Sequence, residues 1–350
     1  MTRAFLIATL CCVATLFAPA GAKAGKPTPL FSDDAPLDIT ITGQIRELVR
    51  GMSRSPTPSD ATLVINGTET EAHAVTISAR GKSRRRKENC QFPPLRIRIK
   101  EKPAKASLFH RQRSLKLVTH CRKTMAFQRH TFLEYAAYKL FNVATDTSFR
   151  VRLAEISYVD EKSGKEIVRR FGFLIEDVDD LAKRVDLKEV SIERASRAQL
   201  NAQSTATVTL FQYMIGNLDW GVLQGPAGDE CCHNAKLIGS SKQAQSDLTP
   251  VPYDFDYAGL VDAPYAVPPA NVNVTRVTSR VYRGFCDFNA ETRVAAETFR
   301  QKKPAFMAAI ETAPGLSERA TKSAQKYLEG FFKSIADDET LEKKLLSNCR

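Results

Sequence analysis

The feature of this chain that most constrains its fold is a change of hydrophobic period near residue 180. Before that point, apolar and polar residues alternate in six segments, at 63–65, 75–79, 95–100, 115–119, 149–158 and 169–176. Such alternation is typical of strands with one buried face. Beyond it, apolar residues recur at helical spacing, at 192–203, 205–215, 290–312 and 318–336. The sequence therefore predicts two lobes, the first rich in strands and the second mostly helical.

One helix is expected to interrupt the strands. Thr131 and Glu134 have the spacing of a capping box, in which a hydroxyl and a carboxylate satisfy the first free N–H groups of a helix. An apolar stripe at helical spacing follows, made of Leu133, Ala136, Ala137, Leu140 and Phe141. Near the other end of the chain, Pro304 should break or kink the helix expected at 290–312.

The first 24 residues have the character of a secretory signal peptide. Arg3 precedes an apolar stretch from Ala4 to Ala18, and small residues suited to cleavage follow it. No run of 18 apolar residues occurs, as an ordinary membrane span would require. We therefore expect the mature chain to be exported, to the periplasm or outside the cell.

Export changes how the cysteines are interpreted. Six remain after the leader, an even number that suggests up to three disulfides. The pairing among them stays open, because six cysteines allow 15 connectivities. The adjacent pair Cys231 and Cys232 is expected to bond elsewhere, since a ring between neighbours strains the peptide. Zinc binding with His233 is the alternative. The six are Cys90, Cys121, Cys231, Cys232, Cys286 and Cys349.

The positive charge is concentrated in one part of the chain. The formal net charge is +12, and residues 80–130 hold 17 Lys and Arg against two acids, a local charge of +15. An exported protein seldom meets nucleic acid, and the aromatic-basic motif of an RNA-binding module is missing, so we expect no nucleic-acid partner. The stretch is interpreted either as a solvated face or as a surface that gathers anions.

Three polar motifs lie in the loop-rich region 216–269. They are Gly216-Asn-Leu-Asp219-Trp220, His233-Asn234 and Tyr253-Asp254-Phe-Asp256. Taken singly, each is typical of a turn in which Asn or Asp binds its own backbone. Their succession at the expected junction of the two lobes favours a shared cleft.

Phosphoryl transfer suits these residue types. It needs a carboxylate to accept the proton of the attacking hydroxyl and oxygen ligands for Mg²⁺. Asp219 fits the first role, and Asn234 and Asp254 fit the second, with Asp256 assisting. Paired carboxylates such as Asp219 and Asp254 also suit a glycosidase.

The cations for the phosphates are expected from the first lobe. Lys116 lies on an alternating segment, and Glu134 either holds its ammonium in place or serves only the capping box. The run from Arg80 to Ser83 lacks the first glycine of a P-loop, but it can still form a turn that presents N–H groups and cations to phosphate.

Between Val75 and Arg283 the sequence resembles the spore coat protein H (CotH) kinase family, an atypical protein-kinase-like group. The resemblance is carried by the Arg80–Ser83 turn, the Lys116-Leu-Val strand, the helix around Glu134, the segment ending at Glu176, and the Asn-x-Asp219 and Asp254-x-Asp256 motifs.

The resemblance implies an α+β, two-lobed protein-kinase-like fold with a β-rich N-lobe and a mostly helical C-lobe. It also implies Mg²⁺-dependent transfer of phosphate from ATP to a protein hydroxyl. Asp219 would be the catalytic acid/base and Lys116 the phosphate-binding lysine, while Glu176 would lie near the adenine. Asn234 and Asp254 would be the metal ligands.

The expected organisation is a signal peptide at 1–24, an extension at 25–60, the N-lobe at 61–178, and the C-lobe with the metal and catalytic loops at 179–350. Two other functions stay open. One is a non-catalytic, disulfide-stabilised envelope or binding protein with a kinase-like shell, and the other is transfer of AMP.

Overall fold

The structure is a computed structural model that describes residues 25–54, 57–67 and 70–350. The signal peptide expected at 1–24 lies outside the described residues.

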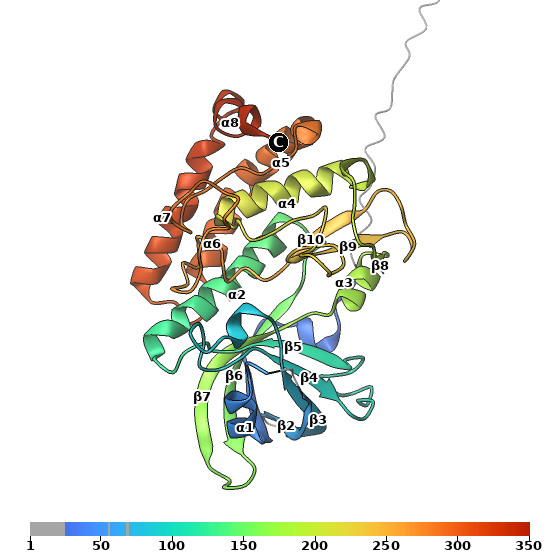
Figure 1. The fold of residues 1–350 in the computed structure, drawn as a ribbon, viewed down its shortest axis with the longest axis vertical. Helices are drawn as coiled ribbons and strands as arrows, with labels where there is room; N and C mark the ends of the chain where they lie inside the picture. Colours follow the sequence, from blue (N-terminus) through green and yellow to red (C-terminus); the bar gives the residue numbers. More distant parts are fainter. Residues whose placement is uncertain (1–24, 55–56, 68–69) are drawn as a thin grey trace, which may run out of the picture.

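The first part of the chain closes into a seven-stranded barrel (Figure 1). The strands are β1 (Leu37–Gly43), β2 (Ser59–Asn66), β3 (Glu71–Ala79), β4 (Leu95–Ile99), β5 (Ser114–Val118), β6 (Val151–Asp160) and β7 (Glu166–Ile175), in the spatial order β1-β2-β3-β4-β5-β7-β6. Every second residue points inward, so the alternation in the sequence fills the barrel with Ile39, Ile41, Val75, Ile77, Leu95, Ile97, Leu115 and Leu117.

The expected two-lobed protein-kinase-like fold, with its β-rich N-lobe and mostly helical C-lobe, is wrong. The segment 25–60, expected to be an extension, supplies β1, which pairs antiparallel with β2 and parallel with β6 and so closes the sheet. The second part of the chain also carries a three-stranded sheet, β8 (Lys188–Val190), β9 (Ala235–Gly239) and β10 (Thr249–Pro252). The six alternating segments do not include β1, the strand that closes the barrel by pairing with both β2 and β6.

The helices form a second core beside the barrel. α2 (Gln128–Ala144) packs against α4 (Ala202–Ile215) and α6 (Lys303–Glu311), while α5 (Asn289–Gln301) packs on α4 and α7 (Glu318–Ser334) packs on α6. The buried residues of this core include Phe141, Phe211 and Phe299. The shorter helices are α1 (Ile45–Arg50), α3 (Val178–Arg184) and α8 (Asp338–Lys344).

Most helical segments agree with the sequence, and one does not. The helix expected over 192–203 is wrong, because only a 3₁₀ turn at Arg197–Gln199 and the start of α4 form there. Pro304 separates α5 from α6 as expected, at a helix start where its missing N–H costs nothing.

The six cysteines are joined in pairs. Cys90 bonds to Cys121 and Cys286 to Cys349, with Cα separations of 4.7 and 5.1 Å. The expectation that Cys231 and Cys232 bond elsewhere is wrong, since they bond to each other across a cis peptide that brings their Cα atoms to 3.0 Å. With both sulfurs engaged, neither is a free thiolate for the zinc alternative. The chain is therefore compatible with a disulfide-bonded protein.

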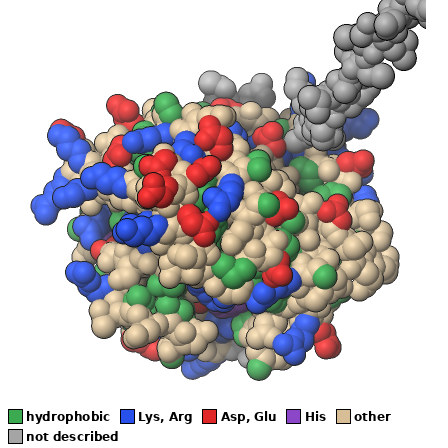
Figure 2. All heavy atoms as spheres, turned by 90° about the horizontal axis from the view of Figure 1, so that it is seen from above, with side chains coloured by type: hydrophobic (Ala, Val, Ile, Leu, Met, Phe, Trp, Pro, Cys, Tyr) green, Lys and Arg blue, Asp and Glu red, His purple; other side chains and the backbone are tan. Residues whose placement is uncertain are grey.

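The helical end of the molecule mixes both signs of charge. Figure 2 shows Lys, Arg, Asp and Glu side chains interspersed there, and two of the ion pairs are Arg293 with Glu342 and Arg300 with Asp338. None of the described helices is both long enough and apolar enough to cross a membrane.

Candidate functional site

The three polar motifs meet around the small sheet. α4 ends at Ile215 and is capped by Gly216, whose φ of 64° turns the chain sharply; Asp219 follows three residues after Gly216. Asn234 directly precedes β9 and Asp254 follows β10 after one residue. Because β9 and β10 are antiparallel, with Ala235 opposite Pro252, these two ends adjoin. The backbone N–H of Tyr253 donates to the Asn234 carbonyl at 3.0 Å.

Asp219 is held by two neighbours from the start of β9. His233 Nε2 lies 2.6 Å from Asp219 Oδ1, and Asn234 Nδ2 donates to Asp219 Oδ2 at 3.1 Å and to its carbonyl at 2.7 Å. The hydrogen bond to Asp219 raises the pKa of His233, against the effect of partial burial. The side chain of Asp219 keeps 30% exposure, so its carboxylate is oriented and still reachable from solvent.

Asp254 and Asp256 supply carboxylates of different character. Asp254 has a φ of 65° and its N–H donates to the Tyr138 hydroxyl at 2.9 Å, while its carboxylate makes no hydrogen bond or ion pair with the part of the chain that the structure describes. Asp256 is buried and accepts from the Tyr265 hydroxyl at 2.8 Å. Burial, followed by the charge of Asp254, raises the pKa of Asp256 to about 7.

The oxygen donors suit Mg²⁺ better than zinc. Among residues 25–54, 57–67 and 70–350, no group of three or more His, Cys, Asp or Glu side chains is placed to hold a metal ion. Mg²⁺ is commonly held by one or two carboxylates, with substrate phosphates and water completing its shell. The Asp254 carboxylate and the Asn234 amide oxygen fit that pattern, because Asn234 uses its amide nitrogen for Asp219.

Glu134 pairs with an arginine that the sequence did not single out. Arg84 Nη1 donates to Glu134 Oε2 at 3.1 Å, and both side chains are buried. The expected pairing of Glu134 with Lys116 is wrong. The expected capping box is also wrong, because α2 begins at Gln128 and Thr131 lies inside it. Burial raises the pKa of Glu134 despite Arg84, and the nearby Asp256 and Asp254 raise it further.

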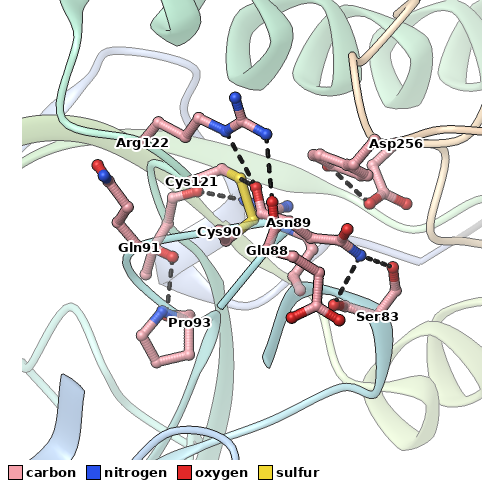
Figure 3. Close-up of a disulfide and its surroundings, with 12 residues drawn as sticks. Ser83, Glu88, Asn89, Cys90, Gln91, Pro93, Cys121, Arg122 and Asp256 are labelled. Atoms are coloured by element: carbon pink, nitrogen blue, oxygen red, sulfur yellow. Dashed lines mark hydrogen bonds between the residues drawn. A yellow bond between two sulfur atoms is a disulfide. The ribbon is translucent and has the colours of Figure 1, made fainter. Parts of the chain in front are cut away.

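The segment that carries Arg84 crosses over this cluster. Ser83 Oγ is hydrogen-bonded to the Tyr257 hydroxyl, and Asn89 Nδ2 donates to Ser83 Oγ at 3.0 Å. The Cys90–Cys121 disulfide holds the end of the segment, and Figure 3 shows it beside Asn89, with Asp256 facing the same space as Ser83. The segment therefore joins the barrel to the loop after β10.

Lys116 belongs to a group of barrel cations. It lies on β5 opposite Arg96 of β4, and its ammonium is 6.0 Å from the centre of the Phe149 ring. Burial lowers the pKa of Lys116 to about 8; Asp177 opposes this, and the charges of Arg80 and Arg96 add to it. The acidic group that acts on Lys116 is Asp177, through its charge. Lys116, Arg80 and Arg96 thus form a positively charged group with little nearby negative charge, which is suited to bind an anion.

Arg80 links the cations to the acids. The charge of Arg80 helps to lower the pKa of Lys116. It also opposes the burial that raises the pKa of Glu134 and of Tyr253. Ser83 is hydrogen-bonded to Tyr257, the residue after Asp256, and the charge of Arg80 acts on both Lys116 and Glu134.

Glu176 lies apart from this cluster. It is fully buried and accepts from Arg184 Nε at 3.1 Å, from Arg184 Nη2 at 2.9 Å and from the Arg150 N–H at 3.0 Å. Both carboxylate oxygens of Glu176 therefore accept hydrogen bonds inside the protein.

Sequence reasoning missed Arg84, His233 as the partner of Asp219, and Arg283, which donates to the carbonyls of the two residues that flank Asp219. Arg84 stands in a run of four cations, Arg84 to Lys87, and only its burial distinguishes it. His233 directly precedes Asn234, so adjacency to a candidate ligand was the available signal.

Comparison of the chain with protein-family models and with curated proteins gives no match.

Proposed function

We propose that this protein is an exported, Mg²⁺-dependent phosphotransferase that moves a phosphoryl group from ATP to a hydroxyl of a protein. The observation that carries the proposal is the convergence of Asp219, Asn234 and Asp254, which are far apart in sequence, at one end of the β9–β10 hairpin. The resemblance of the same motifs to the spore coat protein H kinase family points the same way.

Asp219 would orient the acceptor hydroxyl and take its proton. The acceptor oxygen forms a bond to the γ-phosphorus, the bond from that phosphorus to the β–γ bridging oxygen breaks, and ADP leaves with the electron pair. The contacts from His233 and Asn234 fix the direction of the Asp219 carboxylate and reduce the cost of ordering it.

Asn234 and Asp254, with Asp256 behind them, would hold the metal, which when bound neutralises charge on the phosphates. Lys116 and Arg80 would bind the phosphates from the barrel side. Their positive charges have few partners inside the protein, so phosphate oxygens would relieve the repulsion between them.

The test is a comparison of nucleotide binding and turnover in matched variants. Asp254→Asn keeps the size of the side chain and removes its charge, and Asp219→Asn does the same at the base. The control is Asp262→Asn, because Asp262 is exposed, has a similar φ of 49°, and lies outside the cluster. Thermal unfolding with ATP and Mg²⁺ reports binding, and transfer of ³²P from γ-labelled ATP reports chemistry.

We expect ATP with Mg²⁺ to stabilise the wild type by about 2.7 kcal/mol at a hundred times its Kd. Asp254→Asn should lose this metal-dependent gain, and Asp219→Asn should keep it but lose transfer. Label transferred from α-labelled ATP would identify AMP transfer instead. A wild type that neither nucleotide nor metal stabilises would be the non-catalytic protein, and the proposal would fail.

A further inference from the structure

We infer that the acceptor of this protein is an acidic, hydroxyl-bearing peptide segment, bound in an arginine-lined cleft beside Asp219. This inference rests on the proposed function, because it names the substrate class of the same site. The cleft has a volume of about 650 Å³, within the range of ligand pockets. Its lining includes Asp219 and His233 at one side and Arg194, Arg197, Arg283 and Arg350 around them.

Asp219 connects the cleft to the chemistry. Its carboxylate is the group proposed to take the proton of the acceptor, and Asp219 is among the residues that line the cleft. A hydroxyl within hydrogen-bond reach of Asp219 therefore places the rest of its chain among the arginines. The residues flanking the hydroxyl are the ones that the arginines contact.

Three of the arginines are held against two buried rings. The guanidinium carbon of Arg283 lies 5.1 Å from the Trp220 ring centre, and those of Arg350 and Arg197 lie 5.3 and 4.9 Å from that of Phe285. Stacking fixes the planes of these guanidinium groups, and this reduces the entropy lost on binding an anion.

Arg283 also fixes the loop that carries Asp219. Its Nη1 donates to the carbonyls of Leu218 and Trp220, the two residues that flank Asp219, at 2.5 and 3.0 Å. The Arg350 N–H donates to the Gly284 carbonyl at 3.0 Å, and the adjacent Cys349 is bonded to Cys286. The positive groups and the carboxylate are thus parts of one braced structure.

Among the described residues that line the cleft, four arginines face one carboxylate, that of Asp219. Arg197 is paired with Asp287 at 2.9 Å, whereas Arg194 is exposed and makes no ion pair with a side chain. Burial and the charge of Arg350 lower the pKa of Arg283, although Asp219 opposes them. Carboxylates on the acceptor would relieve this repulsion, and a basic acceptor would add to it. Charge complementarity therefore selects an acidic peptide.

The inference is tested by peptide binding without nucleotide. The probes are two fluorescein-labelled peptides of equal length, one with a serine between glutamates and one with glutamines in their place, followed by fluorescence anisotropy. The variant is Arg194→Gln with Arg350→Gln, which keeps the Arg283 side chain and its hydrogen bonds to the Asp219 loop and removes one hydrogen bond, from Arg350 Nε to the Arg283 carbonyl. The control is Arg50→Gln with Arg319→Gln, two exposed arginines outside the cleft, on α1 and α7.

We expect the wild type to bind the acidic peptide at least tenfold more tightly than the neutral one, with an affinity that falls as salt rises. The cleft variant should lose about three- to tenfold in affinity for the acidic peptide, and the control variant should match the wild type. Equal binding of both peptides by the wild type, or equal loss in the two variants, would overturn the inference. Binding of the acidic peptide without any transfer of phosphate would refute the proposed function alone.

Discussion

Replacement of Lys116 by methionine should stabilise the protein at neutral pH. Burial, reinforced by Arg80 and Arg96, lowers the pKa of Lys116 from 10.5 to about 8. Each tenfold change in the ionisation constant is worth about 1.4 kcal/mol, so the penalty for the charged form is about 3 kcal/mol. The side chain is partly exposed and water screens the charge, so we expect a gain in the free energy of unfolding of about 1 to 2 kcal/mol. Methionine fills a similar volume without the charge.

The sign of the pH dependence follows from the same shift. Between pH 8 and pH 10.5 the unfolded chain binds more protons at Lys116 than the folded chain does, so wild-type stability should rise with pH over that window. The advantage of Lys116→Met is therefore complete below pH 8 and declines to nothing by pH 10.5.

The assay is urea unfolding of both proteins at pH 7, 9 and 10.5. Lys105→Met, at an exposed position, serves as the control and should change little. Inorganic pyrophosphate should raise the midpoint of the wild type and have less effect on Lys116→Met, because the ammonium is proposed to bind phosphate. If Lys116→Met is no more stable than the wild type at pH 7, or keeps its advantage unchanged at pH 10.5, the reasoning is refuted.

The remaining predictions concern packing and cross-links. Arg84→Met should cost about 3 to 5 kcal/mol because it leaves the buried Glu134 carboxylate without its cation, and Arg84→Met with Glu134→Leu should recover much of that in the same unfolding assay. Cys286→Ser with Cys349→Ser should cost about 4 kcal/mol, the loop-closure value for a separation of 63 residues, measured against the wild type under non-reducing conditions. Gly216→Ala should lower the melting temperature and the proposed activity, because the residue has a φ of 64° and the added methyl group would meet the Tyr327 hydroxyl. Gly164→Ala is the control: it has a φ of 66° with open space around it, so it reports the backbone strain without the steric clash.

The strands were predictable where alternation was strict, and the topology was not. Leu95 to Ile99 and Leu115 to Val118 form β4 and β5 as the pattern indicates. β1 alternates equally well, yet no local signal says that it pairs with β6, more than a hundred residues further along. Closure of the barrel is set by such distant pairings, and periodicity carries no information about them.

The candidate site, like the barrel, depends on contacts between distant parts of the chain. Asn234 and Asp254 were identifiable by residue type, and the turn chemistry that supports them is local. Their proximity depends on the β9–β10 pairing, and the Arg84–Glu134 contact depends on how the segment before Cys90 crosses the barrel. Glu176 illustrates the converse, because an acidic residue after a strand is equally suited to an internal ion pair with Arg184.

The parallel pairing of β1 with β6 also bears on how the chain is made. β1 is the first barrel strand in the chain, but its second neighbour β6 ends at Asp160, so one row of its N–H and C=O groups stays unpaired until the sixth of the seven barrel strands has been made. An unpaired edge of that kind readily recruits strands from other molecules. Pairing of strands that are far apart in sequence is also slow, because the chain loses loop entropy before the pairing contacts form. Helper proteins that shield β1 until β6 arrives would therefore be expected to raise the yield of native protein more than those that act on the helices.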